Sequence, residues 1–135
     1  MLPKFKLLEK KPNVVVLFIL AALFGYAAVY IPGLVVAEKV YTAPLFPLVR
    51  TAVESISVIS VLLLFLIGAF LGVLDPDRPL LLGFATMTAF PVLAIIEKTV
   101  DITSHTHFPL EFLYYVLVAL AAVGGAYTGR ELKKK

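Results

Sequence analysis

The residues best suited to chemistry in this chain are charged side chains and imidazoles at the ends of long apolar segments. Carboxylates transfer protons or bind cations, arginine binds anions, and imidazole takes part in acid–base chemistry or binds metals. The candidates are Arg50, Glu54, Glu97, Asp101, His105, His107 and Glu111. The first two are four residues apart, as are the next two, so each pair shares one face of a helix. We predict that all seven lie at one depth, at the boundary of a membrane.

Three interpretations fit these boundary residues. In the first, they form a rim of solvated charge and helix caps, with an ion pair between Arg50 and Glu54. In the second, they line a pocket for a lipid headgroup or another amphiphile, with Arg50 as the anion-binding group. A carboxyl group of Glu54, Glu97 or Glu111 would then serve as acid or base, because desolvation at an apolar boundary stabilises its neutral form.

The third interpretation is a divalent-metal site, since carboxylates and imidazoles are suitable ligands for zinc and similar ions. Only His105 and His107 supply imidazole, and residues two apart point the same way only in extended chain. The chain has no cysteine, so disulfides, thiolate metal sites and iron–sulfur clusters are excluded. Glycine-rich nucleotide loops and hydrolase or zinc-protease signatures are also absent from the sequence. We therefore expect no firm metal site and no cofactor.

Four long apolar segments must position these residues. They cover about residues 13–31, 50–74, 79–97 and 109–130. About 20 residues at 1.5 Å per residue cross the ~30 Å hydrocarbon core of a bilayer. Apolar residues make up 61% of the chain and charged residues only 16%, whereas the helices of a soluble domain keep a polar face. Residues 1–135 are therefore predicted to form one all-α integral membrane domain, with four transmembrane helices in an antiparallel up-down bundle.

The basic residues predict how these helices are oriented. Nine of the 12 Lys and Arg residues lie at the two ends of the chain or in the turn at Arg78. The other three, Lys39, Arg50 and Lys98, lie in the two remaining loops. Because cytoplasmic loops carry the excess of positive charge, both termini are expected in the cytoplasm, in an inner or plasma membrane of prokaryotic type. Basic residues that flank apolar helices in this way do not indicate nucleic-acid binding.

Small residues and prolines predict how the helices pack and bend. Two stripes of small residues recur at four-residue spacing, namely Gly68 and Gly72, and Ala121, Gly125 and Gly129. Such stripes let helix backbones approach closely, either inside one chain or between subunits. Pro91 is expected to kink the third span and to open a lateral crevice for lipid-like ligands. The pair Pro32 and Gly33 is expected to end or kink the first helix.

These features favour a non-enzymatic role, because no catalytic motif accompanies the apolar helices. The favoured interpretation is a small oligomeric membrane component, either a transport or permeation unit or an accessory subunit. The alternative is a membrane-embedded enzyme or a lipid- or amphiphile-binding protein with a polar site at the outer membrane boundary. The expected partners are membrane lipids, together with further copies of the chain or a larger membrane complex.

Overall fold

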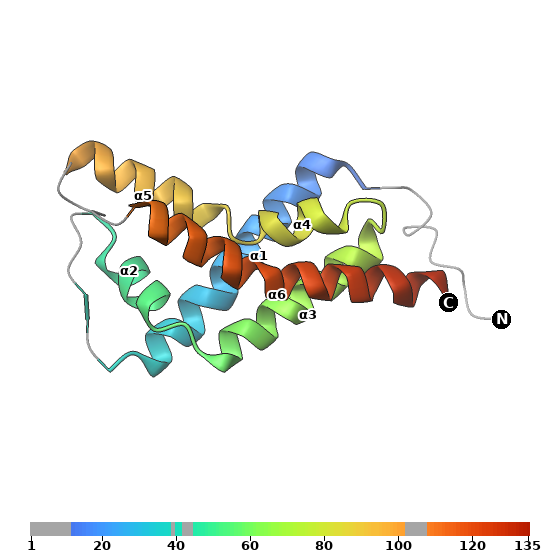
Figure 1. The fold of residues 1–135 in the computed structure, drawn as a ribbon, viewed down its shortest axis with the longest axis horizontal. Coiled ribbons are helices and arrows are strands. Elements are labelled where there is room, and N and C mark those ends of the chain that lie inside the picture. The colour runs from blue at the N-terminus through green and yellow to red at the C-terminus, as the bar shows by residue number, and fades with distance from the viewer. Residues whose placement is uncertain (1–11, 39, 42–44, 102–107) are drawn as a thin grey trace.

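The computed structural model describes residues 12–38, 40–41, 45–101 and 108–135, and every regular element in these ranges is an α-helix. The helices are α1 (Val14–Val36), α2 (Pro47–Glu54), α3 (Val58–Leu74), α4 (Pro79–Ala85), α5 (Ala89–Val100) and α6 (Phe108–Lys134). The start of α1, the turn between α3 and α4 and the end of α6 lie together, at what we call the C-terminal end (Figure 1). The end of α5 and the start of α6 lie with α2 at the opposite end, which we call the α2 end (Figure 1).

Two helices are individually long and apolar enough to cross a membrane, α1 and the Leu110–Lys134 part of α6. α2 and α3 pass the same test together but are bent by 94°, and α4 and α5 pass it together with a bend of 42°. The described residues therefore contain between two and four candidate membrane spans. At this level, the predicted all-helical fold with apolar helices long enough to cross a membrane is confirmed.

The first helix continues through the pair of residues that was expected to end or kink it. α1 runs to Val36, with Pro32 inside it and buried. A proline removes one backbone hydrogen bond, and in an apolar phase the remaining backbone groups are still best satisfied within a helix. A Cβ added to Gly33 would come within 2.4 Å of the carbonyl oxygen of Ala52. The glycine therefore allows close packing between α1 and α2 instead of ending α1.

The segment predicted as the second span, residues 50–74, is divided into two helices. α2 is closed by backbone amides that follow Glu54 and bond to carbonyls three residues earlier. α3 begins after Ser57, whose backbone is extended. Serine side chains compete with helical hydrogen bonding, which favours a break at such positions. Because of the 94° bend, Arg50 and Glu54 belong to a separate short helix and not to the start of the span.

The segment predicted as the third span, residues 79–97, bends by 42° between α4 and α5, and α5 continues to Val100. Pro91 has no amide hydrogen, so the carbonyl of Met87 four residues earlier loses its helical partner. The hydroxyls of Thr86 and Thr88 each donate a 2.7 Å hydrogen bond to the carbonyl three residues earlier. These bonds satisfy backbone oxygens at the bend, as a break at membrane depth requires.

α3 and α6 pack along the two small-residue stripes, and we call this contact the glycine seam. A Cβ added to Gly68 or Gly72 would come within 2.0 Å of a carbonyl oxygen of α6. A Cβ added to Gly125 or Gly129 would come within 1.9 Å of a carbonyl oxygen of α3. Ala121, the remaining member of the stripes, is half-buried against the core. The four glycines therefore serve helix packing inside the chain.

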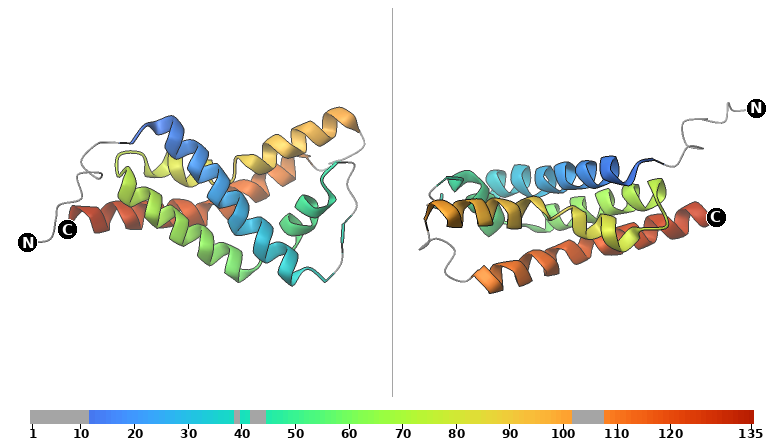
Figure 2. Two further views of the ribbon diagram at one scale, coloured as in Figure 1. Left: turned by 180° about the vertical axis from the view of Figure 1, so that it is seen from behind. Right: turned by 90° about the horizontal axis from the view of Figure 1, so that it is seen from above.

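Seen from above, α1 and α6 lie on opposite sides of the molecule, with α3, α4 and α5 between them (Figure 2). The core between these helices contains two clusters. The cluster nearer the α2 end includes Val29, Leu64, Phe90, Tyr115 and Ala122. Because Phe90 belongs to α5 and Tyr115 to α6, this cluster fixes which faces of those helices turn toward α2.

Candidate functional site

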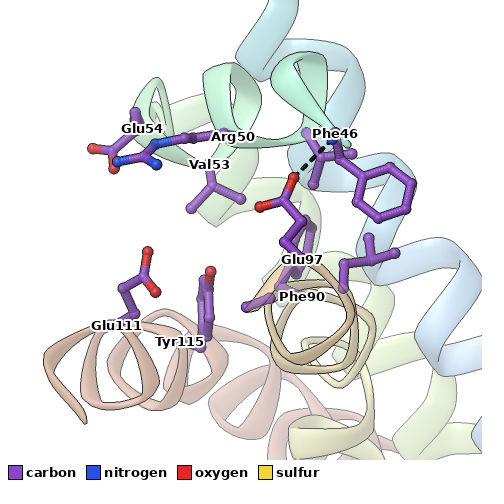
Figure 3. Close-up of a pocket in the computed structure, with 11 residues that line it drawn as sticks. Phe46, Arg50, Val53, Glu54, Phe90, Glu97, Glu111 and Tyr115 are labelled. Atoms are coloured by element: carbon purple, nitrogen blue, oxygen red, sulfur yellow. Dashed lines mark hydrogen bonds between the residues drawn. The ribbon is translucent and has the colours of Figure 1, made fainter. Parts of the chain in front are cut away.

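A pocket lies at the α2 end between α2, α5 and α6. Its outline encloses about 340 Å³ when the open mouth is counted, and its free space is about 20 Å³, room for about one water molecule. The labelled side chains that line it are Phe46, Arg50, Val53, Glu54, Phe90, Glu97, Glu111 and Tyr115 (Figure 3). Four of the seven candidate site residues from the sequence are in this set, although they come from three different helices. The pocket therefore combines side chains from helices with up to three other helices between them along the chain.

Glu97 is the most buried charged group of the pocket, with 3% of its surface exposed. Its Oε1 atom accepts a 2.7 Å hydrogen bond from the backbone amide of Phe46, immediately before α2 (Figure 3). A charge-assisted hydrogen bond of this kind offsets part of the cost of burying a carboxylate. Because the bond joins α5 to the start of α2, Glu97 positions one wall of the pocket as well as lining it.

A second set of contacts holds α2 from its other side. The buried hydroxyl of Thr51 donates a 2.8 Å hydrogen bond to the carbonyl of Pro47 and accepts a 2.9 Å bond from the amide of Tyr41. Pro47 is at the first turn of α2, where its missing amide hydrogen costs little. With Glu97 on one side and Thr51 on the other, this eight-residue helix is held in place despite its short length.

Arg50 and Glu54 lie on neighbouring turns of α2 at the mouth of the pocket (Figure 3). Glu54 is exposed and Arg50 is half-buried. The Nε atom of Arg50 is buried and has no hydrogen-bond partner, and the described contacts include no ion pair between these two side chains. Such a pair is worth at most about 0.5 kcal/mol on a helix surface, which is too little to fix two long side chains. The donor at Nε is therefore buried without a partner, which costs stability.

The wall opposite α2 is made by α6. Glu111 is half-buried and points toward α2, and Tyr115 lies one turn further along the same face, 6% exposed (Figure 3). The Tyr115 ring stacks on Phe90 at a centroid distance of 6.0 Å, and Phe90 stacks on Tyr26 at 5.7 Å. Sequence reasoning missed these aromatic residues, although the four-residue spacing from Glu111 to Tyr115 was a usable signal.

The other three candidate residues are not part of the described pocket. Asp101 is the residue that follows α5, and it is half-buried but does not line the pocket. His105 and His107 lie outside the described residues, and so does the metal site that they were considered for. Within the described part of the chain, no group of three or more possible ligands is placed to hold a metal ion.

A second hollow adjoins the pocket on the side of the α4–α5 bend. It measures about 430 Å³ when its open side is counted, and its exposed lining is almost entirely apolar. Its lining residues are Phe84, Met87, Thr88, Pro91, Phe112, Tyr115, Val116 and Ala119. Tyr115 borders both hollows. We call this second hollow the crevice, and it lies where the kink at Pro91 was expected to open one.

The two hollows differ in the groups they can bind. In the pocket, three carboxylates and one guanidinium leave an excess of negative charge among the described lining residues. Carboxylates attract cations. In the crevice, the hydroxyl of Thr88 is already bonded to the carbonyl of Ala85, so the surface left to a ligand is apolar.

No family model matches this chain, and no curated protein or solved structure shows significant similarity to it. The class of protein is therefore defined by the fold and the two hollows. It is an all-helical protein whose described residues include two to four helical segments able to cross a membrane. At the α2 end, it carries a carboxylate-lined pocket beside an apolar crevice.

Proposed function

We propose that this chain is a four-span membrane protein that binds an amphiphile in the pocket between α2, α5 and α6. One observation carries the proposal: Arg50 and three carboxylates, from three helices, converge on a single pocket. Charged groups beside an apolar phase are costly and are usually found where they pair or bind something. A rim of solvated charge would have these groups pointing apart into water, whereas Glu97 is buried and Glu111 half-buried.

In this proposal the spans are α1, α3, the bent α4–α5 pair and α6, and α2 lies along the membrane boundary. The 17 residues of α3 extend about 26 Å at 1.5 Å per residue, close to the ~30 Å of a bilayer core. α3 thus crosses most of the bilayer without α2. The distribution of Lys and Arg supports cytoplasmic termini, so that the pocket opens at the opposite, outer boundary.

An oligomeric transport unit or accessory subunit, which the sequence favoured, stays a prediction. That interpretation drew on the small-residue stripes, and their four glycines are engaged between α3 and α6 of one chain. The stripes therefore give no argument for contact between copies. A binding role also needs no catalytic motif, and the sequence supplies none.

The proposal is tested by identifying what the protein retains after purification. Protein extracted from membranes in a neutral detergent is washed, and bound amphiphiles are released into organic solvent and quantified by mass spectrometry. The wild type is expected to retain one species in about a 1:1 ratio to the chain, above the background of bulk lipid. The Glu54→Gln/Glu111→Gln double variant is expected to lose most of it, because the polar contacts of the pocket are weakened.

Glu131→Gln is the matched control. Glu131 is an exposed carboxylate at the C-terminal end of α6, in a 2.7 Å salt bridge with Lys134, and it is remote from the pocket. Its replacement removes one carboxylate from α6, the helix that also carries Glu111, and is expected to leave retention unchanged. If all three proteins retain the same amphiphiles in the same amounts, the pocket is not a binding site and the proposal fails.

A further inference from the structure

Tyr115 separates two hollows of opposite character. The pocket on one side carries the carboxylates of Glu54, Glu97 and Glu111, and the crevice on the other side is apolar. Both hollows are open, and together they form a polar compartment that adjoins an apolar one. A ligand that fills both must therefore be polar at one end and apolar at the other.

The two hollows also follow one another along the axis of α6. The polar pocket comes first and the apolar crevice second, which matches the order of headgroup and alkyl chain in an amphiphile of a membrane leaflet. Glu111 is at the pocket, Tyr115 is at the division and Ala119 lines the crevice, all on one face of α6. Eight residues of helix correspond to about 12 Å, so the crevice continues from the charged boundary toward the centre of the molecule. An alkyl chain anchored by its headgroup among the carboxylates would follow this direction.

The lining of each hollow limits the ligand further. Carboxylates outnumber the guanidinium by three to one in the pocket, and the aromatic side chains of Phe90 and Tyr115 are part of its lining. The faces of these rings are engaged in stacking, so the carboxylates are the groups that suit an ammonium group. Without its open side, the crevice has about 180 Å³ of free space. This is below the range of about 300–1,000 Å³ for small-molecule sites, so the crevice suits one alkyl chain better than two.

We infer that the ligand of this protein is a single-chain cationic amphiphile, with its ammonium group in the pocket and its alkyl chain in the crevice. This inference rests on the proposed function and gives it a ligand class. The occupant of the crevice is an alkyl chain because the crevice adjoins the charged pocket and is open at membrane depth, where lipid chains are the available apolar partners.

The headgroup is tested with three probes that share a dodecyl chain: dodecylammonium, dodecyltrimethylammonium and dodecyl sulfate. Binding to the full-length protein in a neutral detergent is measured by calorimetry and by the shift in melting temperature. Both cations are expected to bind, and dodecyl sulfate is expected to bind at least tenfold more weakly. Glu54→Gln/Glu111→Gln should weaken the binding of the cations about tenfold, whereas Glu131→Gln should have no effect. Partitioning into micelles is the same for every variant, so differences between variants report the site.

The position of the ligand's alkyl chain is tested with variants that narrow the crevice. Val116 lines it and is 45% exposed, whereas the adjacent Leu117 is 56% exposed and does not line it. In the wild type, affinity should rise from octylammonium to dodecylammonium. Val116→Trp should abolish that rise, and the milder Val116→Phe should reduce it without threatening the fold. Leu117→Trp, on the lipid-facing side, is the matched control and should retain the wild-type dependence on chain length.

The possible outcomes separate this inference from the proposed function. If dodecyl sulfate binds more tightly than the cations, and its binding is lost in Glu54→Gln/Glu111→Gln, the pocket binds amphiphiles but the inferred charge is wrong. If affinity depends on alkyl-chain length in the same way in Val116→Phe, Val116→Trp and Leu117→Trp, the alkyl chain does not occupy the crevice and the inference fails. If no probe distinguishes the wild type from Glu54→Gln/Glu111→Gln, the proposed function fails with it.

Discussion

The glycine seam and the pocket are opposite kinds of helix contact made by the same helix, α6. In the seam, α6 approaches α3 so closely that no Cβ fits at Gly72 or Gly129. In the first half of α6, the inward-facing side chains are Glu111 and Tyr115, which are large and line the pocket. The size of the facing side chains therefore sets the separation of the helices, so one helix can close the bundle at one end and leave it open at the other.

The two ends also differ in how completely polar groups are satisfied. Three buried side-chain atoms in the described part of the chain have no hydrogen-bond partner, and they belong to Arg50, Ser57 and Ser60. All three residues are in α2, before α3 or in its first turn, at the α2 end. Buried polar groups without partners cost stability and are unusual in well-packed regions. We therefore expect the α2 end, which carries the open, polar site, to be less stable than the C-terminal end.

The largest effect is expected from a substitution in the seam. Gly125→Leu should lower the free energy of unfolding by about 3 kcal/mol or more, because a Cβ at this position would overlap the Phe65 carbonyl and drive α3 and α6 apart. Unfolding is followed by circular dichroism during heating in detergent. The adjacent Gly124→Leu is the matched control, since the nearest atom to a Cβ there is a ring carbon of Phe65 at 3.9 Å. It should change stability by less than about 1 kcal/mol, and equal losses in the two variants would show that the seam is not a tight contact.

A smaller and more local effect is expected at the pocket from Glu97→Ala. This change removes the acceptor for the Phe46 amide and should cost about 1–3 kcal/mol, mostly as loosening of the start of α2. Hydrogen exchange read by mass spectrometry should show faster exchange in residues 45–50 and unchanged exchange in the seam. Glu97→Gln keeps an oxygen acceptor and should retain most of the protection. Uniform loss of protection in both regions would mean that the two ends are not independent.

Pro91→Ala tests whether the proline causes the bend between α4 and α5 beside the pocket. The alanine supplies an amide to the Met87 carbonyl, worth about 0.5–1.5 kcal/mol, and should straighten the 42° bend between α4 and α5. The chain has no cysteine, so Leu80→Cys and Val100→Cys give a unique pair for spin labels, whose separation should increase in Pro91→Ala. Pro79→Ala is the control, because Pro79 occupies the first turn of α4, where no hydrogen bond is lost. An unchanged distance distribution in Pro91→Ala would locate the cause of the bend in the packing and not in the proline.

How much the sequence could predict depends on whether each feature has a local signature. The membrane-spanning character follows from long apolar runs, and the stripes containing Gly72 and Gly125 follow from their spacing. The break after Glu54 was not predicted, because charges four residues apart fit a continuous helix as well as a separate one. Pro32 and Gly33 were expected to end or kink the first helix, and α1 does not end there; local breaker signals do not account for the continued hydrogen bonding that an apolar phase favours.

The candidate site could be predicted only where side chains carry charge. Glu97 and Glu111 stand out in the sequence as acids at the ends of apolar segments. The hydrogen bond from the Phe46 amide could not be predicted, because every residue except proline has such a donor. The stacking of Phe90 on Tyr115 depends on how α5 is rotated after the bend, and rotation is set by packing across the whole bundle.

The smallest expected effect concerns Ser60, which is fully buried in the first turn of α3 and whose hydroxyl has no partner. A serine deeper in a helix can donate to the carbonyl four residues earlier, but the residue four before Ser60 precedes α3. Ser60→Ala removes an unsatisfied hydroxyl and should therefore raise the free energy of unfolding, by up to about 1 kcal/mol. Thr86→Val is the contrasting variant, because that hydroxyl is bonded to the Gly83 carbonyl, and it should lower stability by about 1 kcal/mol. If both substitutions lowered stability equally, the Ser60 hydroxyl would have a hydrogen-bond partner in the membrane. The buried polar groups of the α2 end would then be as well hydrogen-bonded as those of the seam.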